Sequence, residues 1–74
     1  MKLLDVTKGH SACIVGFHGG KGVDFKLRQL GLTPGREVKV LRFAPMGGPV
    51  MLDVEGRSVA IGRGIAARVE VKVK

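Results

Sequence analysis

The sequence predicts a mostly β domain, a small antiparallel β-barrel with one short α-helix after the first strand. Apolar residues recur in five short segments of strand character, and glycine and proline separate these segments. No long helical pattern alternates with the strands, as it does in parallel α/β folds. We expect closure into a barrel because it removes the edge strands that otherwise pair with other chains.

A chain of 74 residues has room for one hydrophobic core, so we expect a single domain over residues 1–74. Apolar residues make up 45% of the sequence, too many for a disordered chain. No apolar run approaches the ~18 residues of a membrane span. The single cysteine, Cys13, excludes an internal disulfide and fits a reducing compartment. These features together predict a cytosolic protein.

The chain is strongly basic, with 13 Lys and Arg against 6 Asp and Glu and a net charge of +7. Such a charge favours association with acidic partners. Three classes of partner qualify: nucleic acid, the anionic inner face of a membrane, and an acidic protein surface. Charge by itself does not choose among them.

The first strand is predicted at residues 11–17, and the glycine cluster at residues 19–22 ends it. This junction has a superficial likeness to a phosphate-binding loop. Such a loop needs glycine at position 15 and a hydroxyl at position 22, where this chain has Val15 and Gly22. We therefore expect a flexible turn here and no bound nucleotide.

A short helix is predicted at residues 25–30. Asp24 can serve as its N-cap, and Gly31 supplies the left-handed residue that ends it. A helix of about two turns does not persist alone in water, so it must pack against the sheet. The residues expected to pack are Leu27, Leu30 and Leu32.

Residues 33–36 have the composition of a type II turn, with Pro34 and Gly35 at its two central positions. The second strand is predicted at residues 36–43. Its apolar pattern changes face at Leu41, which indicates a β-bulge or a bend.

The remaining strands are predicted at residues 50–54, 58–62 and 67–73. A proline- and glycine-rich loop at residues 45–49 precedes the first of them, and a tight reversal at residues 55–57 joins the first two into a hairpin. Period-two alternation is clearest in the last strand. In the last two strands, the residues expected to face the core are Val59, Ile61, Ala67, Val69, Val71 and Val73.

His10, Cys13 and His18 are of residue types that ligate zinc or iron. On a strand, however, His10 and Cys13 point to opposite faces, and a fourth ligand would have to be a distant carboxylate such as Asp5. We expect a buried, inert thiol and two solvated imidazoles. A Cys–His nucleophile lacks an evident third, orienting group, so we predict no enzyme, no metal site and no cofactor.

Strand alternation places a set of basic residues on the outer face: Lys39, Arg42, Arg57, Arg68, Lys72 and Lys74. A solvated, protective face is the ordinary interpretation. RNA binding is the alternative, since small barrels bind nucleic acid. Single-strand binders use aromatic platforms, and this chain has no Trp, no Tyr and three Phe. We expect Phe43 in the core, and Phe17 and Phe25 partly exposed.

The predicted helix offers a better docking surface. If its leucines face inward, an aromatic residue and several basic or polar residues face outward, a composition that interfaces favour. An amphipathic helix with an inert charged side is the competing interpretation. Met46, at the tip of the loop at residues 45–49, can add a flexible apolar contact. The candidate docking residues are Phe25, Lys26, Arg28, Gln29 and Met46.

Several segments follow one another in a distinctive order. They are the LRQLGLTPG stretch at residues 27–35, the APMGGP stretch at residues 44–49, Gly56 with the VAI stretch at residues 59–61, Ala66, and the final VEV at residues 69–71. Together these segments resemble the ferrous iron transport protein A (FeoA) family. The resemblance covers nearly the whole chain. It implies an SH3-like barrel that works in the cytosol with a large ferrous iron membrane transporter carrying a GTP-binding domain. It also implies kinship with the SH3-like C-terminal domain of metal-dependent repressors.

Two positions depart from the family pattern, because many members carry Arg where this chain has Lys26 and Asp where it has Gly48. The family has no shared iron ligand set, so the resemblance does not imply iron binding by this chain. We expect a cytosolic accessory protein that docks onto the transporter. Weak association with the anionic inner face of the membrane and self-association are further expectations, and a small RNA-binding barrel is the alternative.

Overall fold

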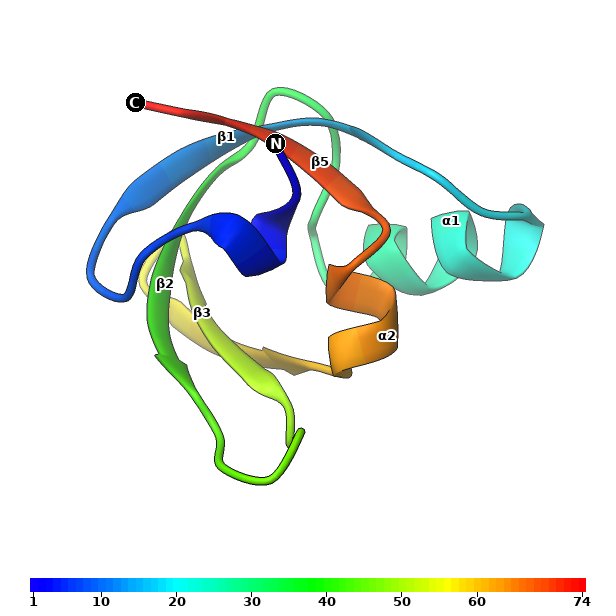
Figure 1. Cartoon of the computed structure of the whole chain (residues 1–74). Coiled ribbons are helices and arrows are strands. Elements are labelled where there is room, and N and C mark those ends of the chain that lie inside the picture. Colours follow the sequence, from blue (N-terminus) through cyan, green and yellow to red (C-terminus); the bar gives the residue numbers. More distant parts are fainter.

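Five antiparallel strands form one sheet that curls around the core in the computed structural model, which describes all residues, Met1–Lys74. The elements in chain order are the 3-10 turn η1 (Leu3–Asp5), β1 (Ser11–Phe17), α1 (Lys21–Gln29), β2 (Glu37–Phe43), β3 (Val50–Val54), β4 (Arg57–Ile61), α2 (Arg63–Ala66) and β5 (Val69–Val73). The strand order is β4-β3-β2-β1-β5, so the first and last strands lie side by side (Figure 1).

The mostly β architecture with a helix after the first strand is confirmed, but full closure of the barrel is not. β4 and β5 stand at opposite ends of the strand order, and no ladder joins them. The chain leaves β4 at Gly62 and turns through α2 before it reaches β5 (Figure 1). The sheet therefore keeps two edges.

The core consists of sixteen buried residues, all of them apolar. β3 shows the alternation most plainly, because Val50, Leu52 and Val54 are buried. The predicted bulge in the second strand is confirmed, since the pairing of β2 with β3 shifts register between Val40 and Arg42.

The helix begins earlier than predicted. α1 starts at Lys21, not at residue 25, and extended Gly20 is its N-cap. Asp24 is therefore not the N-cap; it lies in the first turn. Tertiary packing overrides the poor helix propensity of the glycine cluster, because the earlier start adds Val23 to the stripe that packs on the core.

The predicted helix end and the following turn are confirmed. Gly31 has a φ of 80°, and the Leu32 N–H donates to the Leu27 carbonyl at 2.8 Å, as in a Schellman cap. Gly35 has a φ of 90°, and the Arg36 N–H donates to the Thr33 carbonyl at 3.0 Å.

The region before β5 differs from the prediction. Residues 63–66 form the helix α2, which the sequence pattern does not predict, and β5 starts at Val69 instead of residue 67. Ala66 is fully buried, whereas Ala67 is exposed and Val73 is 43% exposed. The prediction that Ala67 and Val73 face the core was therefore wrong. The helical turn shifts the alternation, and the end of β5 extends past the core.

Candidate functional site

The outer face of α1 is the most distinctive surface of the molecule. Its exposed residues are Lys21, Gly22, Phe25, Lys26, Arg28 and Gln29. On the inner face Leu27 has no exposed surface, and Val23 and Leu30 pack against the core. Phe25 is 63% exposed. The structure thus gathers four of the five predicted docking residues on one helix face.

Charge surrounds Phe25 on this face. Arg28 pairs with Asp24 at 3.2 Å, an i,i+4 pair along the helix. Lys21 and Lys26 have no acidic partner within ion-pair distance. The outer face of α1 therefore presents an exposed aromatic ring beside two uncompensated positive charges.

Met46, the fifth predicted residue, lies elsewhere. It occupies the tip of the loop between β2 and β3, is fully exposed, and has a φ of 60°. Gly47 has a φ of 73°, and the Gly48 N–H donates to the Pro45 carbonyl at 3.1 Å, which makes a type I′ turn. In Figure 1 this loop lies at the bottom of the view, well away from α1 at the right, so the structure does not bring the loop to the helix face.

Arg63 at the start of α2 holds this loop in place. Its Nε donates to the Gly48 carbonyl at 3.3 Å and its Nη2 to the Ala44 carbonyl at 3.1 Å. The guanidinium carbon also lies 5.9 Å from the centre of the Phe43 ring. Arg63 was not among the predicted functional residues, because its role depends on α2, a helix that the sequence pattern does not predict.

The three residues considered for metal binding do not form a site. His10 and His18 are exposed, and Cys13 is half-buried, less protected than the buried thiol that was predicted. No group of three or more His, Cys, Asp or Glu side chains lies close enough to hold a metal ion. Cys13 lies on β1 between β2 and β5, on the face opposite to the buried side chains of Ala12 and Ile14.

Glu70 on β5 is the centre of a small ionic cluster. Its carboxylate contacts the Met1 amino group, the Lys2 Nζ at 3.3 Å and the His18 Nε2 at 3.4 Å. Hydrogen bonds from the Met1 amino group and from Lys2, with a smaller one from His18, lower the pKa of Glu70 from 4.5 to about 2. A carboxylate so strongly stabilised as an anion is a structural pairing group and a poor general acid.

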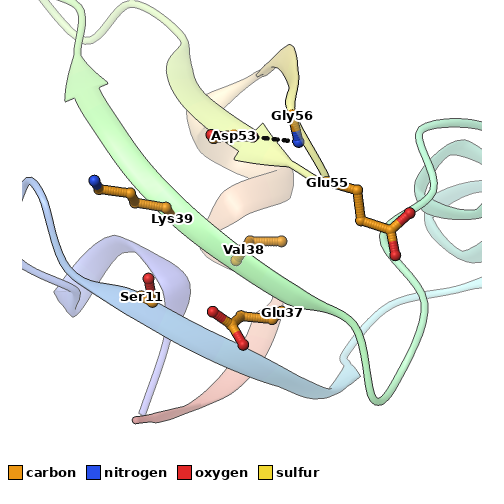
Figure 2. A pocket seen from close by; sticks show the side chains of 7 residues that line it. All are labelled: Ser11, Glu37, Val38, Lys39, Asp53, Glu55 and Gly56. Carbon is orange, nitrogen blue, oxygen red and sulfur yellow. Dashed lines mark hydrogen bonds between the residues drawn. The ribbon is translucent and has the colours of Figure 1, made fainter.

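A shallow groove of about 450 Å³ is lined by residues of β1, β2 and β3 and of the turn after β3, and three of these residues are acidic (Figure 2). Each is already engaged. Asp53 accepts the Gly56 N–H at 2.8 Å, Glu55 pairs with Arg36, and Glu37 pairs with Lys74 at 2.8 Å and thereby raises the pKa of Lys74. The Glu55 carboxylate points away from Asp53. The three carboxylates of the groove are therefore held by a turn and by two ion pairs.

The predicted outer basic residues are all exposed: Lys39, Arg42, Arg57, Arg68, Lys72 and Lys74. Phe43 and Phe17 are half-buried against the core, so Phe25 is the single strongly exposed aromatic residue. A base-stacking platform needs more than one such ring. Neither α-helix has the length or the apolar composition needed to cross a bilayer.

Comparison with known proteins gives a consistent result. The model of the FeoA domain family matches residues 1–73. A Methanocaldococcus jannaschii protein, named as an Fe(2+) transport protein A, is 31% identical over 70 residues, which is 95% of this chain and 83% of that protein.

Solved structures agree with the sequence matches. The crystal structure of an iron uptake regulatory protein of the FeoA type has a TM-score of 0.91 and 38% identity, covering 100% of this chain and 97% of that one. The Zn²⁺-bound repressor ScaR has a TM-score of 0.87 over 97% of this chain and 36% of its own. Its identity is 18%, so it shows the fold alone, and this fold agrees with the predicted SH3-like architecture.

Proposed function

The chain belongs to the FeoA family, whose members take part in ferrous iron transport, and from this premise we propose that it is a cytosolic accessory protein of ferrous iron uptake. It docks through the outer face of α1 onto the cytosolic part of a large membrane iron transporter that carries a GTP-binding domain. It modulates the nucleotide cycle or the assembly of that transporter and performs no chemistry of its own.

The exposure of Phe25 supports this proposal more than any other observation. A ring that is 63% exposed buries little of its surface in the fold and so gains little stabilisation from it. Lys21 and Lys26 flank it without acidic partners. Interface hot spots are enriched in aromatic residues, and charge complementarity fixes their orientation. The matching surface on the transporter is an apolar pocket with an acidic rim.

An accessory role also fits the rest of the molecule. FeoA proteins are small accessory domains and are not a known enzyme family. The carboxylates of the groove in Figure 2 are committed to ion pairs and a turn. With its acids and bases paired off in this way, the surface of the chain is suited to contact and not to proton transfer.

The net charge of +7 gives the docking a secondary contribution. Each basic group close to an anionic leaflet contributes roughly 1 kcal/mol, and salt screens this attraction. The charge concentrates the protein near the cytosolic face of the membrane, where the transporter is embedded. It supplements the contact through α1 and does not replace it.

Co-purification with the transporter tests the proposal. The transporter is expressed with the wild-type chain, with Phe25→Ala or with Met46→Ala, and the recovered amounts are compared. Removal of a hot-spot ring lowers affinity by at least about tenfold, which is ~1.4 kcal/mol. Met46→Ala is the matched control, because it removes another exposed apolar side chain far from α1. Retention of Phe25→Ala at the wild-type level would show that the helix face is not the contact.

A salt titration separates this function from the RNA-binding alternative. Docking through a desolvated ring tolerates moderate salt, whereas RNA affinity falls as counterions compete for the phosphates. The measurement compares binding of the transporter and of a single-stranded RNA across the same salt series. Tight RNA binding that survives in Phe25→Ala and falls steeply with salt would favour the nucleic-acid function.

A further inference from the structure

The two edge strands of the sheet, β5 and β4, differ in how well their outer backbone groups are covered. Along the outer edge of β5, the Val71 N–H donates to the Met1 carbonyl at 2.8 Å, and Lys2 forms a bridge with Glu70. Lys72 adds a charge to the same strand. Such covering and charge are the usual protection of an edge strand against pairing with another chain.

The outer edge of β4 has no such cover. A two-residue turn, Glu55 and Gly56, joins β3 to β4, so the pair Val54–Arg57 next to it is hydrogen-bonded. Bonded and non-bonded pairs alternate along an antiparallel ladder. The backbone N–H and C=O groups of Ser58 and Ala60 therefore point away from β3, and no other element supplies a backbone partner for them.

This edge carries few of the usual sequence guards. Arg57, the first residue of β4, is its one charge, and from Ser58 to Gly62 there is no charged residue and no proline. The register with β3 runs without a bulge from Val54–Arg57 to Val50–Ile61. Ser58 and Ala60 are small and exposed, so their side chains do not block the approach of another strand.

We propose that β4 pairs in antiparallel fashion with β4 of a second copy of this chain, giving a symmetric dimer. Ser58 of one copy lies opposite Ala60 of the other, and each such pair exchanges N–H···O=C bonds in both directions. Val59 of one copy lies opposite Val59 of the other, at the two-fold axis. The outward backbone donors and acceptors of one β4 therefore match those of a second β4 that runs in the opposite direction.

The charges of the edge are compatible with this register. Arg57 of one copy lies opposite Ile61 of the other, so the two guanidinium groups stand at opposite ends of the paired strands. The small, neutral side chains of Ser58 and Ala60 offer an acidic peptide no charge to recognise. A second copy is therefore the better occupant. The proposal does not rest on docking through α1, because that face takes no part in the pairing.

Dimerisation is measured on the full chain by sedimentation velocity and by amide NMR shifts, from about 0.05 to about 1 mM protein. We expect the sedimenting mass to rise with concentration, and the amide signals of Ser58 and Ala60 to shift most. Because each copy carries +7, association strengthens several-fold as salt screens the repulsion. A mass that stays monomeric over this range at high salt overturns the proposal.

Two variants locate the contact. Ala60→Pro removes an outward N–H without removing a bond to β3, and edge strands tolerate proline there. Ala60→Lys adds a guarding charge to the same edge and keeps the backbone unchanged. Both are expected to abolish association, whereas Met46→Lys, which adds the same charge at a distant tip, leaves it unaltered. Association at wild-type strength in a folded Ala60 variant assigns the dimer to another surface and refutes the pairing.

Discussion

Leu27 and Phe25 stand two residues apart on the same helix and have opposite environments. Leu27 has no exposed surface, whereas Phe25 is 63% exposed. Residues two positions apart on an α-helix are rotated by about 200° around the helix axis, so one side chain enters the core and the other faces away from it. The packing of the core accounts for Leu27. It does not account for the exposed aromatic ring of Phe25. The inner face of α1 thus stabilises the fold, and its outer face is available to a partner.

The largest effect is expected at the inner face. Leu27→Ala removes a fully buried side chain and leaves a cavity between α1 and the sheet. We expect a loss of about 2–5 kcal/mol in the free energy of unfolding, measured by chemical denaturation followed by circular dichroism. A domain of this size has a total stability of roughly 4–11 kcal/mol, so the variant is at best marginally folded. A loss below ~1 kcal/mol would mean that α1 is not anchored through this residue.

Two glycines of the α1 region, Gly31 after its end and Gly22 in its first turn, are expected to change stability in opposite directions when they are replaced by alanine. Gly31 has a φ of 80°, and an added Cβ lies 3.1 Å from the Arg57 Nη2, so Gly31→Ala is expected to destabilise by about 1 kcal/mol. Gly22 lies inside the helix, and its added Cβ meets nothing within 4 Å. Gly22→Ala is expected to stabilise by about 0.5–1 kcal/mol. Thermal unfolding measures whether each variant unfolds at a lower or a higher temperature than the wild type. A change in the same direction for both variants would contradict the helix boundaries.

These boundaries show what could be predicted from the sequence. The end of α1 was predictable, because Gly31 and the Pro34–Gly35 turn are local signals that only a few conformations satisfy. The start was not, because Gly20 caps the helix with no side-chain bond. The extra turn exists through the contact of Val23 with the core, a tertiary contact that local propensity does not reveal.

The second helix and the open sheet escaped prediction for a related reason. The four residues of α2 carry no cap with a side-chain bond and no recognisable period. Without α2 the sequence passes directly into the alternation of the last strand, so Ala67 was placed inward and Arg63 was given no role. Closure of the barrel depends on where two strand ends meet in space, and alternation within each strand does not determine it.

The ionic cluster around Glu70 on β5 predicts how the stability of the domain depends on acid. Hydrogen bonds from the Met1 amino group, Lys2 and His18 lower the pKa of Glu70 to about 2 from 4.5. A lowered pKa means that the anion stabilises the fold at neutral pH, and that this contribution is lost as pH falls from about 4.5 toward 2. In this window, the free energy of unfolding should therefore fall more in the wild type than in Glu70→Gln. Parallel pH profiles for the two proteins would contradict the role of this cluster.

The smallest effect on stability is expected at Phe25, and it bears most directly on the comparison. Because the ring is largely exposed, Phe25→Ala removes little buried area, and we expect the free energy of unfolding to change by no more than about 0.5 kcal/mol. Alanine also has the higher helix propensity, which offsets part of any loss. Chemical denaturation beside Leu27→Ala measures both variants under the same conditions. A loss above ~2 kcal/mol at Phe25 would show that the ring belongs to the fold; the docking proposal would then lose its main support, because weaker co-purification would simply reflect an unstable protein.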